Sequence, residues 1–383
     1  MGLHFSEKEF NLRKSKVLFE MKNQNIDALL MFRQESMYWL TGYDTFGYVF
    51  FQTLILDQKG NTVLLTRAPD LRQAQNTSNI NDIRIWVDKD QSNPTDDLKV
   101  ILDDLNLKGK KLGIEYEAYG LTGRNALRLN KSLKNFCLIE DKSELITKLR
   151  VIKSEEEIVY VKKAAELADK ALNEVWKHAK AGVSESKILA EMNKVIFEGG
   201  GDYPANEFII GSGKNALLCR YQAEKQILSN TDQLTIEWAG TYKHYHSAMF
   251  RTIPIGKVHS NHYKMHEACI EALKKCEKQL IPGNKAGEVF DIHAKTFDDL
   301  GFNKARMNAC GYSLGATFSP NWMDWPMIYK NNPYVIQPGN VFFMHMILMD
   351  SDNDLAMNLG ETYLVTETGN ERLGRQKLDL VTL

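Results

Sequence analysis

A helix-starting signal near the middle of the chain, at residues 154–157, is the feature that most constrains how this sequence can fold. Ser154 precedes three glutamates, so its side chain can accept from the helix N-terminus while Glu157 reaches back. A long amphipathic pattern follows, to about Lys180, and Gly182 ends it. Since 383 residues are too many for one ordinary core, we expect two domains, 1–145 and 146–383.

Strand-like and helix-like segments alternate before this boundary. Residues 5–24 predict an amphipathic helix, and Asp57–Gly60 is a plausible hairpin turn. Apolar or alternating runs predict strands at 28–32, 50–56, 62–66, 83–87 and 112–115, with helices at 95–105 and 123–129. Such alternation is typical of a three-layer or doubly wound α/β domain.

The pattern after the boundary is different. Besides the helix to about residue 180, helices are predicted at 184–198, 262–279 and 287–300. Strands are predicted at 207–210, 233–239, 248–255, 339–349 and 361–366. Helices packed on an antiparallel sheet make an α+β domain.

Composition narrows the class of function. The chain has 48 basic and 49 acidic residues, which leaves no electrostatic footprint for nucleic acid or an anionic membrane. No apolar run approaches the ~20 residues of a membrane span, and residues 1–10 lack the apolar segment of a signal peptide. The five cysteines are scattered without a C-x-x-C pair. We therefore expect a cytoplasmic protein with reduced thiols.

Several ordered motifs resemble the creatinase, aminopeptidase P and prolidase family. Leu149–Ile158 looks like the opening of that family's catalytic domain, and Tyr38–Gly42 resembles the strand-end motif of its N-terminal domain. Further matches follow in order at 211–221, 237–252, 311–315, 338–346 and 359–369. The resemblance implies an α/β N-terminal domain, an α+β pita-bread catalytic domain and a homodimer.

The metallopeptidases of this family bind two metal ions through two Asp, one His and two Glu. In this chain the corresponding positions hold Glu237, Ala248, Tyr312, His345 and Gly360. Alanine and glycine have no ligand atom, and tyrosine is a poor ligand for hard divalent ions. The comparison therefore implies a protein without metal or other cofactor. A mononuclear site made by Glu237, His246 and His345 is the alternative.

The family's metal-free enzymes, creatinase and ectoine hydrolase, hydrolyse small amidine or cyclic amidine substrates. Residues 237–252, 311–315 and 320–322 resemble the ectoine hydrolase pattern, whereas Ala248 is the main likeness to creatinase. Both enzymes carry a histidine, the proposed acid/base, where this chain has Arg220. Arginine stays protonated and cannot act as a base, so neither chemistry nor substrate carries over directly.

Four residues are candidates for a catalytic role. His246 is the preferred base because imidazole titrates near neutrality, although a hydrogen-bonded core histidine is an open alternative. Glu237 lies among apolar neighbours, which would raise its pKa toward that of a tuned base. Tyr312 can donate to a developing oxyanion or amide, or it is a simple packed ring. His345, a polar residue in an apolar strand, is expected to face the site.

Two groups of residues are candidates for substrate binding. Arg220 offers a planar fork for a substrate carboxylate, or else it pairs internally with Glu237 or Glu224. Trp322 and Trp325 suggest an aromatic wall for a cation, or a hydrophobic lid.

Three N-terminal residues complete the candidate set. The resemblance implies that Arg33, Phe46 and Tyr48 reach across the dimer to the partner's pocket.

The residues and the resemblance together suggest a metal-independent hydrolase that opens a C–N bond of a small nitrogenous zwitterion, ectoine- or creatine-like. Water would be activated by His246 or Glu237. A carbon–heteroatom lyase is one alternative, because a base beside a carboxylate clamp also suits proton abstraction. Others are an Xaa-Pro peptidase derived from the metallopeptidases and a non-catalytic peptide-binding scaffold.

Overall fold

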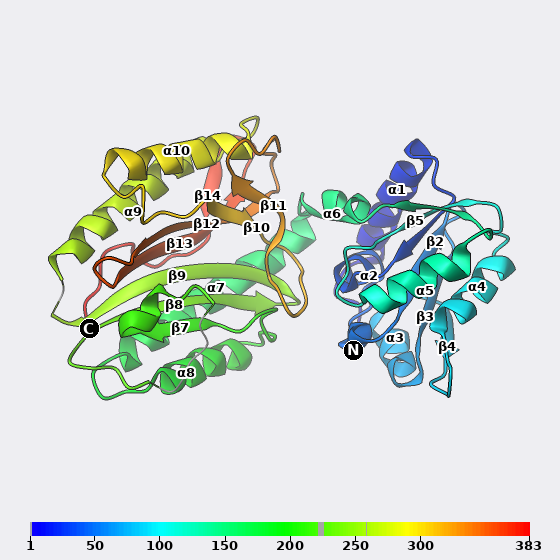
Figure 1. Ribbon diagram of the computed structural model, residues 1–383, viewed down its shortest axis with the longest axis horizontal. Coiled ribbons are helices and arrows are strands. Elements are labelled where there is room, and N and C mark those ends of the chain that lie inside the picture. Colours follow the sequence, from blue (N-terminus) through cyan, green and yellow to red (C-terminus); the bar gives the residue numbers. More distant parts are fainter. Residues whose placement is uncertain (1, 221–225, 258) are drawn as a thin grey trace. The chain divides into compact units, whose positions relative to one another are not determined.

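The computed structural model describes residues 2–220, 226–257 and 259–383. The chain forms two compact units, Met1–Arg150 and Val151–Leu383 (Figure 1). Helix α6 (Glu144–Arg150) closes the first unit because Leu145 and Ile146 are buried in its core. Among the described residues, no helix has both the length and the apolar character needed to cross a bilayer.

The first unit is a three-layer α/β domain, as expected. Its six-stranded sheet has the order β4-β3-β2-β1-β5-β6. The strands are β1 (Ala28–Met31), β2 (Thr53–Asp57), β3 (Thr62–Arg67), β4 (Asp82–Trp86), β5 (Lys111–Ile114) and β6 (Leu138–Asp141). The helices are α1 (Glu7–Asn23), α2 (Gln34–Thr41), α3 (Leu71–Thr77), α4 (Pro94–Asp104) and α5 (Gly123–Leu133). Alternate residues of β1 enter two different cores, one with α4 and α5 and one with α1, α2 and α6.

Two local expectations in this unit have different outcomes. Asp57–Gly60 is the predicted turn between antiparallel β2 and β3, and Gly60 has a positive φ of 86°. Tyr38–Gly42, in contrast, does not end a strand. It forms the last turn of α2, where Gly42 at φ 83° donates its N–H to the Tyr38 carbonyl as the helix cap.

The second unit is the expected α+β domain. Its antiparallel sheet has the order β11-β10-β12-β13-β9-β8-β7, with β14 beside β13. The strands are β7 (Ile209–Ser212), β8 (Thr231–Tyr242), β9 (Tyr245–Gly256), β10 (Ala309–Ser313), β11 (Asp324–Tyr329), β12 (Val341–Asp350), β13 (Leu355–Val365) and β14 (Asn370–Arg372). The helices are α7 (Glu155–His178), α8 (Glu185–Glu198), α9 (Ser260–Gln279) and α10 (Ala286–Asp299).

Helix α7 begins at the predicted capping box. The Ser154 N–H donates to Glu157 Oε2 at 2.9 Å, and the Glu157 N–H donates to the Ser154 hydroxyl. The helix lies against β8, where Trp238 donates its indole N–H to the Ala168 carbonyl. A side chain at Gly240 would collide with the α7 backbone at Ala164, so glycine allows this close packing.

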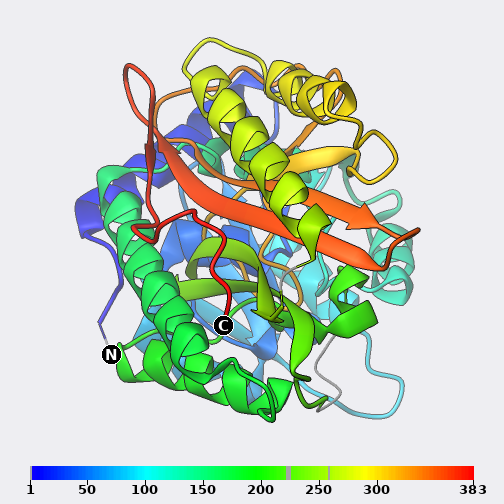
Figure 2. The ribbon, with the colours of Figure 1, turned by 90° about the vertical axis from the view of Figure 1, so that its left-hand side faces the viewer.

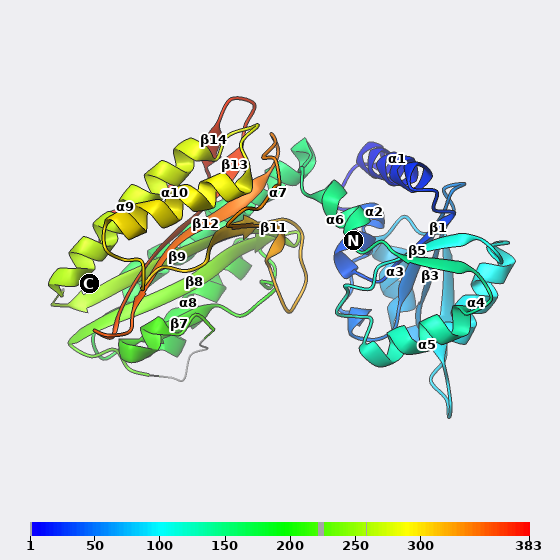
Figure 3. The ribbon, with the colours of Figure 1, turned by 45° about the horizontal axis from the view of Figure 1, so that its top comes forward.

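The helices of the second unit cover one face of its sheet (Figures 2 and 3). Trp238 of β8 meets α7, while Met344 and Met346 of β12 enter the core formed with α9 and α10. Because side chains alternate along a strand, Glu237 and His345 point to the opposite face. That second face carries the candidate site.

Candidate functional site

Strand register places distant residues on this second face. Glu237 of β8 is opposite Phe250 of β9, Phe250 is opposite Gly360 of β13, and Gly360 is opposite His345 of β12. Tyr312 of β10 pairs with Phe343, two positions before His345 on the same strand face. Register alone therefore gathers the family's ligand positions, including Ala248 two residues before Phe250.

A cavity of about 200 Å³ opens among these side chains. Five of the ten candidate site residues line it: Arg220, Glu237, Tyr312, Trp322 and His345. Arg220 lies in the loop after the short helix Gly213–Leu217. Glu237 is on β8, Tyr312 on β10 and His345 on β12, while Trp322 lies in the connection between β10 and β11. The cavity holds a carboxylate, a guanidinium, an imidazole and a phenol, which is enough for acid–base chemistry on a small polar molecule.

Two hydrogen bonds join Trp322, Tyr312 and Glu237. The indole Nε1 of Trp322 donates to the Tyr312 hydroxyl at 2.9 Å, and that hydroxyl donates to Glu237 Oε1 at 3.1 Å. An indole N–H can only donate, so the phenol oxygen accepts from it and keeps its own hydrogen for Glu237. Burial also raises the pKa of the Tyr312 phenol, which keeps that hydrogen in place at neutral pH.

The carboxyl group of Glu237 is tuned to neutral pH. Desolvation raises its pKa to about 7, although the Tyr312 hydrogen bond and the positive charge of Arg220 act in the opposite direction. A carboxyl group with this pKa can both accept and return a proton near pH 7. Its Oε1 already accepts from Tyr312, which leaves Oε2 to exchange a proton.

Arg220 lies exposed at the rim of the cavity. Its charge lowers the pKa of Glu237, whereas Glu224, the other predicted partner, lies outside the described residues. The neighbouring Cys219 is half-buried, and both burial and the Glu237 charge raise the pKa of its thiol. Cys219 therefore stays a neutral thiol, and the guanidinium is the charged group at the rim.

His345 faces the cavity as a neutral imidazole. Its ring centroid lies 5.7 Å from that of Tyr312, and burial lowers its pKa to about 4. Its Nδ1 is buried and has no hydrogen-bond partner among the described residues. A buried imidazole nitrogen without a partner is costly, so a bound molecule that supplies one would be favoured.

The structure does not bring His246 into the cavity. Its Nε2 accepts from the Ala205 N–H at 2.9 Å, so the other ring nitrogen carries the hydrogen and lies 3.2 Å from the Thr317 hydroxyl. Burial lowers the pKa of His246 to about 3. Both nitrogens are occupied, and the Trp322 ring lies tilted beside the imidazole with centroids 6.3 Å apart, so this geometry corresponds to the core-histidine alternative.

Four other candidates are not among the residues that line the cavity. Trp325 sits on the outward side of β11, where its ring packs against Tyr334. Arg33, Phe46 and Tyr48 belong to the first unit. Arg33 donates to the Thr147 hydroxyl, Phe46 is exposed and Tyr48 is buried. Whether they serve a partner's cavity stays a prediction.

Sequence reasoning missed several lining residues. Phe250 and Ile347 lie two positions after Ala248 and His345, so strand alternation from the ligand positions identifies both. Asn206, whose Oδ1 accepts from the Trp322 N–H at 3.2 Å, lies in a loop with no periodic signal.

The residues present do not fit a dinuclear metal centre. A side-chain atom at Gly360 would lie 2.6 Å from the Phe343 ring and 2.8 Å from Phe250, so aromatic carbon occupies the space of one ligand. Ala248 offers no donor atom, and the Tyr312 hydroxyl is committed to Glu237. The mononuclear alternative also loses a ligand, since both nitrogens of His246 are engaged.

Comparison with known proteins places this geometry in a family. The model of metallopeptidase family M24 matches residues 160–367, and the creatinase/prolidase N-terminal domain matches residues 13–152. The chain belongs to metallopeptidase family M24. It is 27% identical to an ectoine hydrolase of Halomonas elongata over 97% of both chains. It is also 25% identical to an Xaa-Pro dipeptidase of Pyrococcus horikoshii, over 97% of this chain and 99% of that protein.

Solved structures of the M24 family share the fold. A prolidase from Thermococcus sibiricus superposes with a TM-score of 0.87 at 21% identity, covering 98% of this chain and 99% of that one. An Xaa-Pro dipeptidase from Bacillus anthracis gives a TM-score of 0.85 at 19% identity, over 98% and 100%. These likenesses confirm the pita-bread architecture expected from the sequence motifs.

Proposed function

We propose that this M24 member hydrolyses a C–N bond of a small nitrogenous zwitterion without a metal ion. One observation carries the proposal: Glu237, the carboxylate left at the family's ligand positions, is held by Tyr312 with a pKa of about 7. A carboxyl group so tuned can perform the proton transfers that hydrolysis needs. The cavity of about 200 Å³ suits a small molecule.

Glu237 is the general base of the proposed reaction. Its Oε2 takes a proton from water as the hydroxide oxygen bonds to the electrophilic carbon of an amide or amidine. The tetrahedral adduct then collapses, the C–N bond breaks, and Glu237 returns the proton to the departing nitrogen. One water is consumed, and no oxidant or reductant is required.

The other cavity groups bind and orient the substrate. Arg220 at the rim presents two parallel N–H groups to a carboxylate. Nδ1 of His345 on β12, which has no hydrogen-bond partner among the described residues, supplies a neutral hydrogen-bonding atom. These two groups favour a substrate with an anionic end and a polar nitrogenous end.

The relatives support a hydrolase and leave two substrate classes. The ectoine hydrolase likeness favours a non-peptide C–N bond, whereas the Xaa-Pro dipeptidase likeness favours a dipeptide, which is also a zwitterion. The filled position at Gly360 and the missing donor at Ala248 argue against metal-dependent peptide cleavage. We therefore place the non-peptide substrate first and the Xaa-Pro dipeptide second. A lyase would use the same base, but no contact among the described cavity residues favours it.

A ligand screen with a metal-removal arm tests the proposal. Ectoines, betaines, guanidino acids and Xaa-Pro dipeptides are screened by thermal shift, because a ligand that binds the native state raises the melting temperature with concentration. The best ligand is then assayed for turnover before and after treatment with EDTA. We expect a non-peptide zwitterion to be cleaved at an unchanged rate. Cleavage confined to Xaa-Pro dipeptides, or activity lost with EDTA and restored by Mn²⁺ or Zn²⁺, would contradict it.

A further inference from the structure

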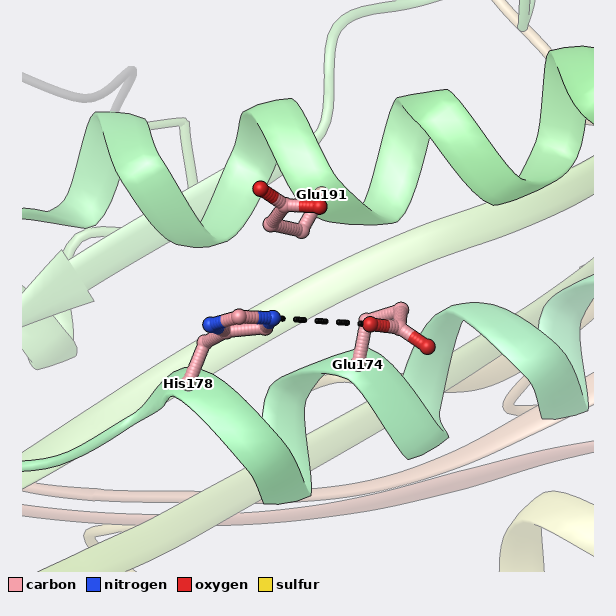
Figure 4. Close-up of side chains that lie close together, drawn as sticks. All are labelled: Glu174, His178 and Glu191. Atoms are coloured by element: carbon pink, nitrogen blue, oxygen red, sulfur yellow. Dashed lines mark ion pairs between the residues drawn. The ribbon is translucent and has the colours of Figure 1, made fainter.

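Helices α7 and α8 carry a second cluster of polar side chains, on the opposite face of the sheet from the cavity. Glu174 and His178 lie one turn apart on α7, so both point to the same side of that helix. Glu191 projects toward them from the neighbouring α8 (Figure 4). The pairing of α7 with α8 thus gathers two carboxylates and one imidazole.

The distances in this cluster suit a small cation. One potential ligand atom from each residue lies within 4.8 Å of the other two. His178 Nε2 lies 3.5 Å from Glu174 Oε2 and forms an ion pair with it when the imidazole is protonated (Figure 4). Tetrahedral zinc with bonds of about 2.0–2.1 Å holds its ligand atoms about 3.3–3.4 Å apart. The imidazole and the carboxylate are therefore spaced as two ligands of one ion.

The positive charges beside the cluster are lysine side chains that an ion can replace. The Glu174 and Glu191 side chains are only 13% and 17% exposed. Their partners Lys177 and Lys187 are 63% and 55% exposed, on long flexible stems. Because water screens the exposed ammonium end of each pair, a divalent ion can take its place beside the carboxylate.

We propose that Glu174, His178 and Glu191 form a site for a divalent transition metal, with zinc as the best-suited ion. Carboxylate oxygen and imidazole nitrogen are both zinc ligands, and water completes the tetrahedron. Side chains from two packed helices build metal sites in helical bundles in the same way. Here the ion cross-links α7 to α8 and stabilises the native state.

Zinc titration of the metal-stripped protein tests this site. Calorimetry should show one equivalent of Zn²⁺ per chain and a concentration-dependent rise in melting temperature. His178→Ala and Glu191→Gln should each weaken the affinity at least about tenfold, since each removes a ligand. Glu166→Gln is the matched control, because Glu166 pairs with Lys163 on the exposed surface of the same helix. Circular dichroism without metal checks that every variant is folded.

Three outcomes overturn the proposal: no zinc binding, binding unchanged in both ligand variants, or equal weakening in Glu166→Gln. A Glu237→Gln variant separates this site from the cavity. Zinc binding retained in Glu237→Gln and lost in His178→Ala supports the α7–α8 site and leaves the metal-independent reaction intact. The reverse pattern would place the ion in the cavity and refute both proposals.

Discussion

The indole nitrogen of Trp322 lies 2.9 Å from the hydroxyl oxygen of Tyr312, and this contact sets the direction of the hydrogen bond to Glu237. The indole cannot accept, so the phenol oxygen accepts from it and donates its own hydrogen to the ionised Glu237. Trp322 is 1% exposed and also lines the cavity, and in the proposed reaction it positions Tyr312. Its part in an aromatic wall for a substrate cation stays a prediction.

Trp322→Phe is expected to raise the pKa of Glu237. Without the indole donor, the Tyr312 hydroxyl loses its orientation and stabilises the carboxylate less. A base works when ionised, so the rising limb of the rate–pH profile should move above pH 7. Tyr312→Phe removes the bond itself, worth about 1.5–3 kcal/mol to a charged group, and should move the limb by about one to two pH units. Unmoved profiles in both variants would exclude Glu237 as the titrating base.

Glu237→Gln is expected to stabilise the protein at alkaline pH. The folded-state pKa of about 7 exceeds the ordinary value of 4.5, so the native state holds the proton more tightly than the unfolded chain. Stability is therefore lost as pH rises from about 4.5 to 7, by about 3 kcal/mol at most. Glutamine does not ionise and avoids this loss. The difference in melting temperature, Glu237→Gln minus wild type, should increase between pH 5 and pH 8, by up to about 10 °C.

The control for this pH series is Glu207→Gln, which removes one exposed charge near the same cavity. A parallel pH dependence in Glu207→Gln would show that net charge, and not the buried carboxyl group, produces the effect.

Arg220→Lys is expected to impair ligand affinity while the ligand-free melting temperature stays nearly constant. Lysine keeps the charge but lacks the two parallel donors that hold a carboxylate. Loss of a charge-assisted bond costs about 1.5–3 kcal/mol, roughly ten- to a hundredfold in dissociation constant. Calorimetry with the best ligand measures the affinity, and thermal unfolding without ligand measures the melting temperature. Unchanged affinity together with a large loss of stability would instead assign Arg220 an internal structural role.

The protein is expected to be a two-fold dimer in solution, with the first unit bordering the partner's cavity. Phe46 is 76% exposed, and Val49 and Phe50 beside it are also exposed. An isologous contact is the commonest way to cover such a surface. Scattering at micromolar concentration should give twice the chain mass, and Phe46→Ser should shift it toward the monomer. The control is Tyr203→Ser, at an 81% exposed tyrosine of the second unit, which should leave the dimer mass unchanged. A monomeric wild type would refute this assembly.

Local sequence patterns were enough for the elements whose structure depends on near neighbours. The Ser154–Glu157 capping box and the Asp57–Gly60 turn form as predicted, because each is closed by hydrogen bonds between residues two to four apart. The motif Tyr38–Gly42 shows the limit of this approach. A glycine there signals only that an element ends, and tertiary packing decided that the element is helix α2.

The site itself was decided by tertiary structure. The sequence named Glu237, Tyr312 and His345, but it left the base open between Glu237 and His246. Strand register brings Tyr312 into hydrogen-bond contact with Glu237, 75 residues away in the sequence. The acceptor nitrogen of His246 is occupied by the Ala205 N–H, so it is not available to activate water. Sequence alone determines which side chains are available. Which of them lose water, meet a partner and acquire a shifted pKa depends on the strands and loops that surround them, and only the folded sheet brings those together.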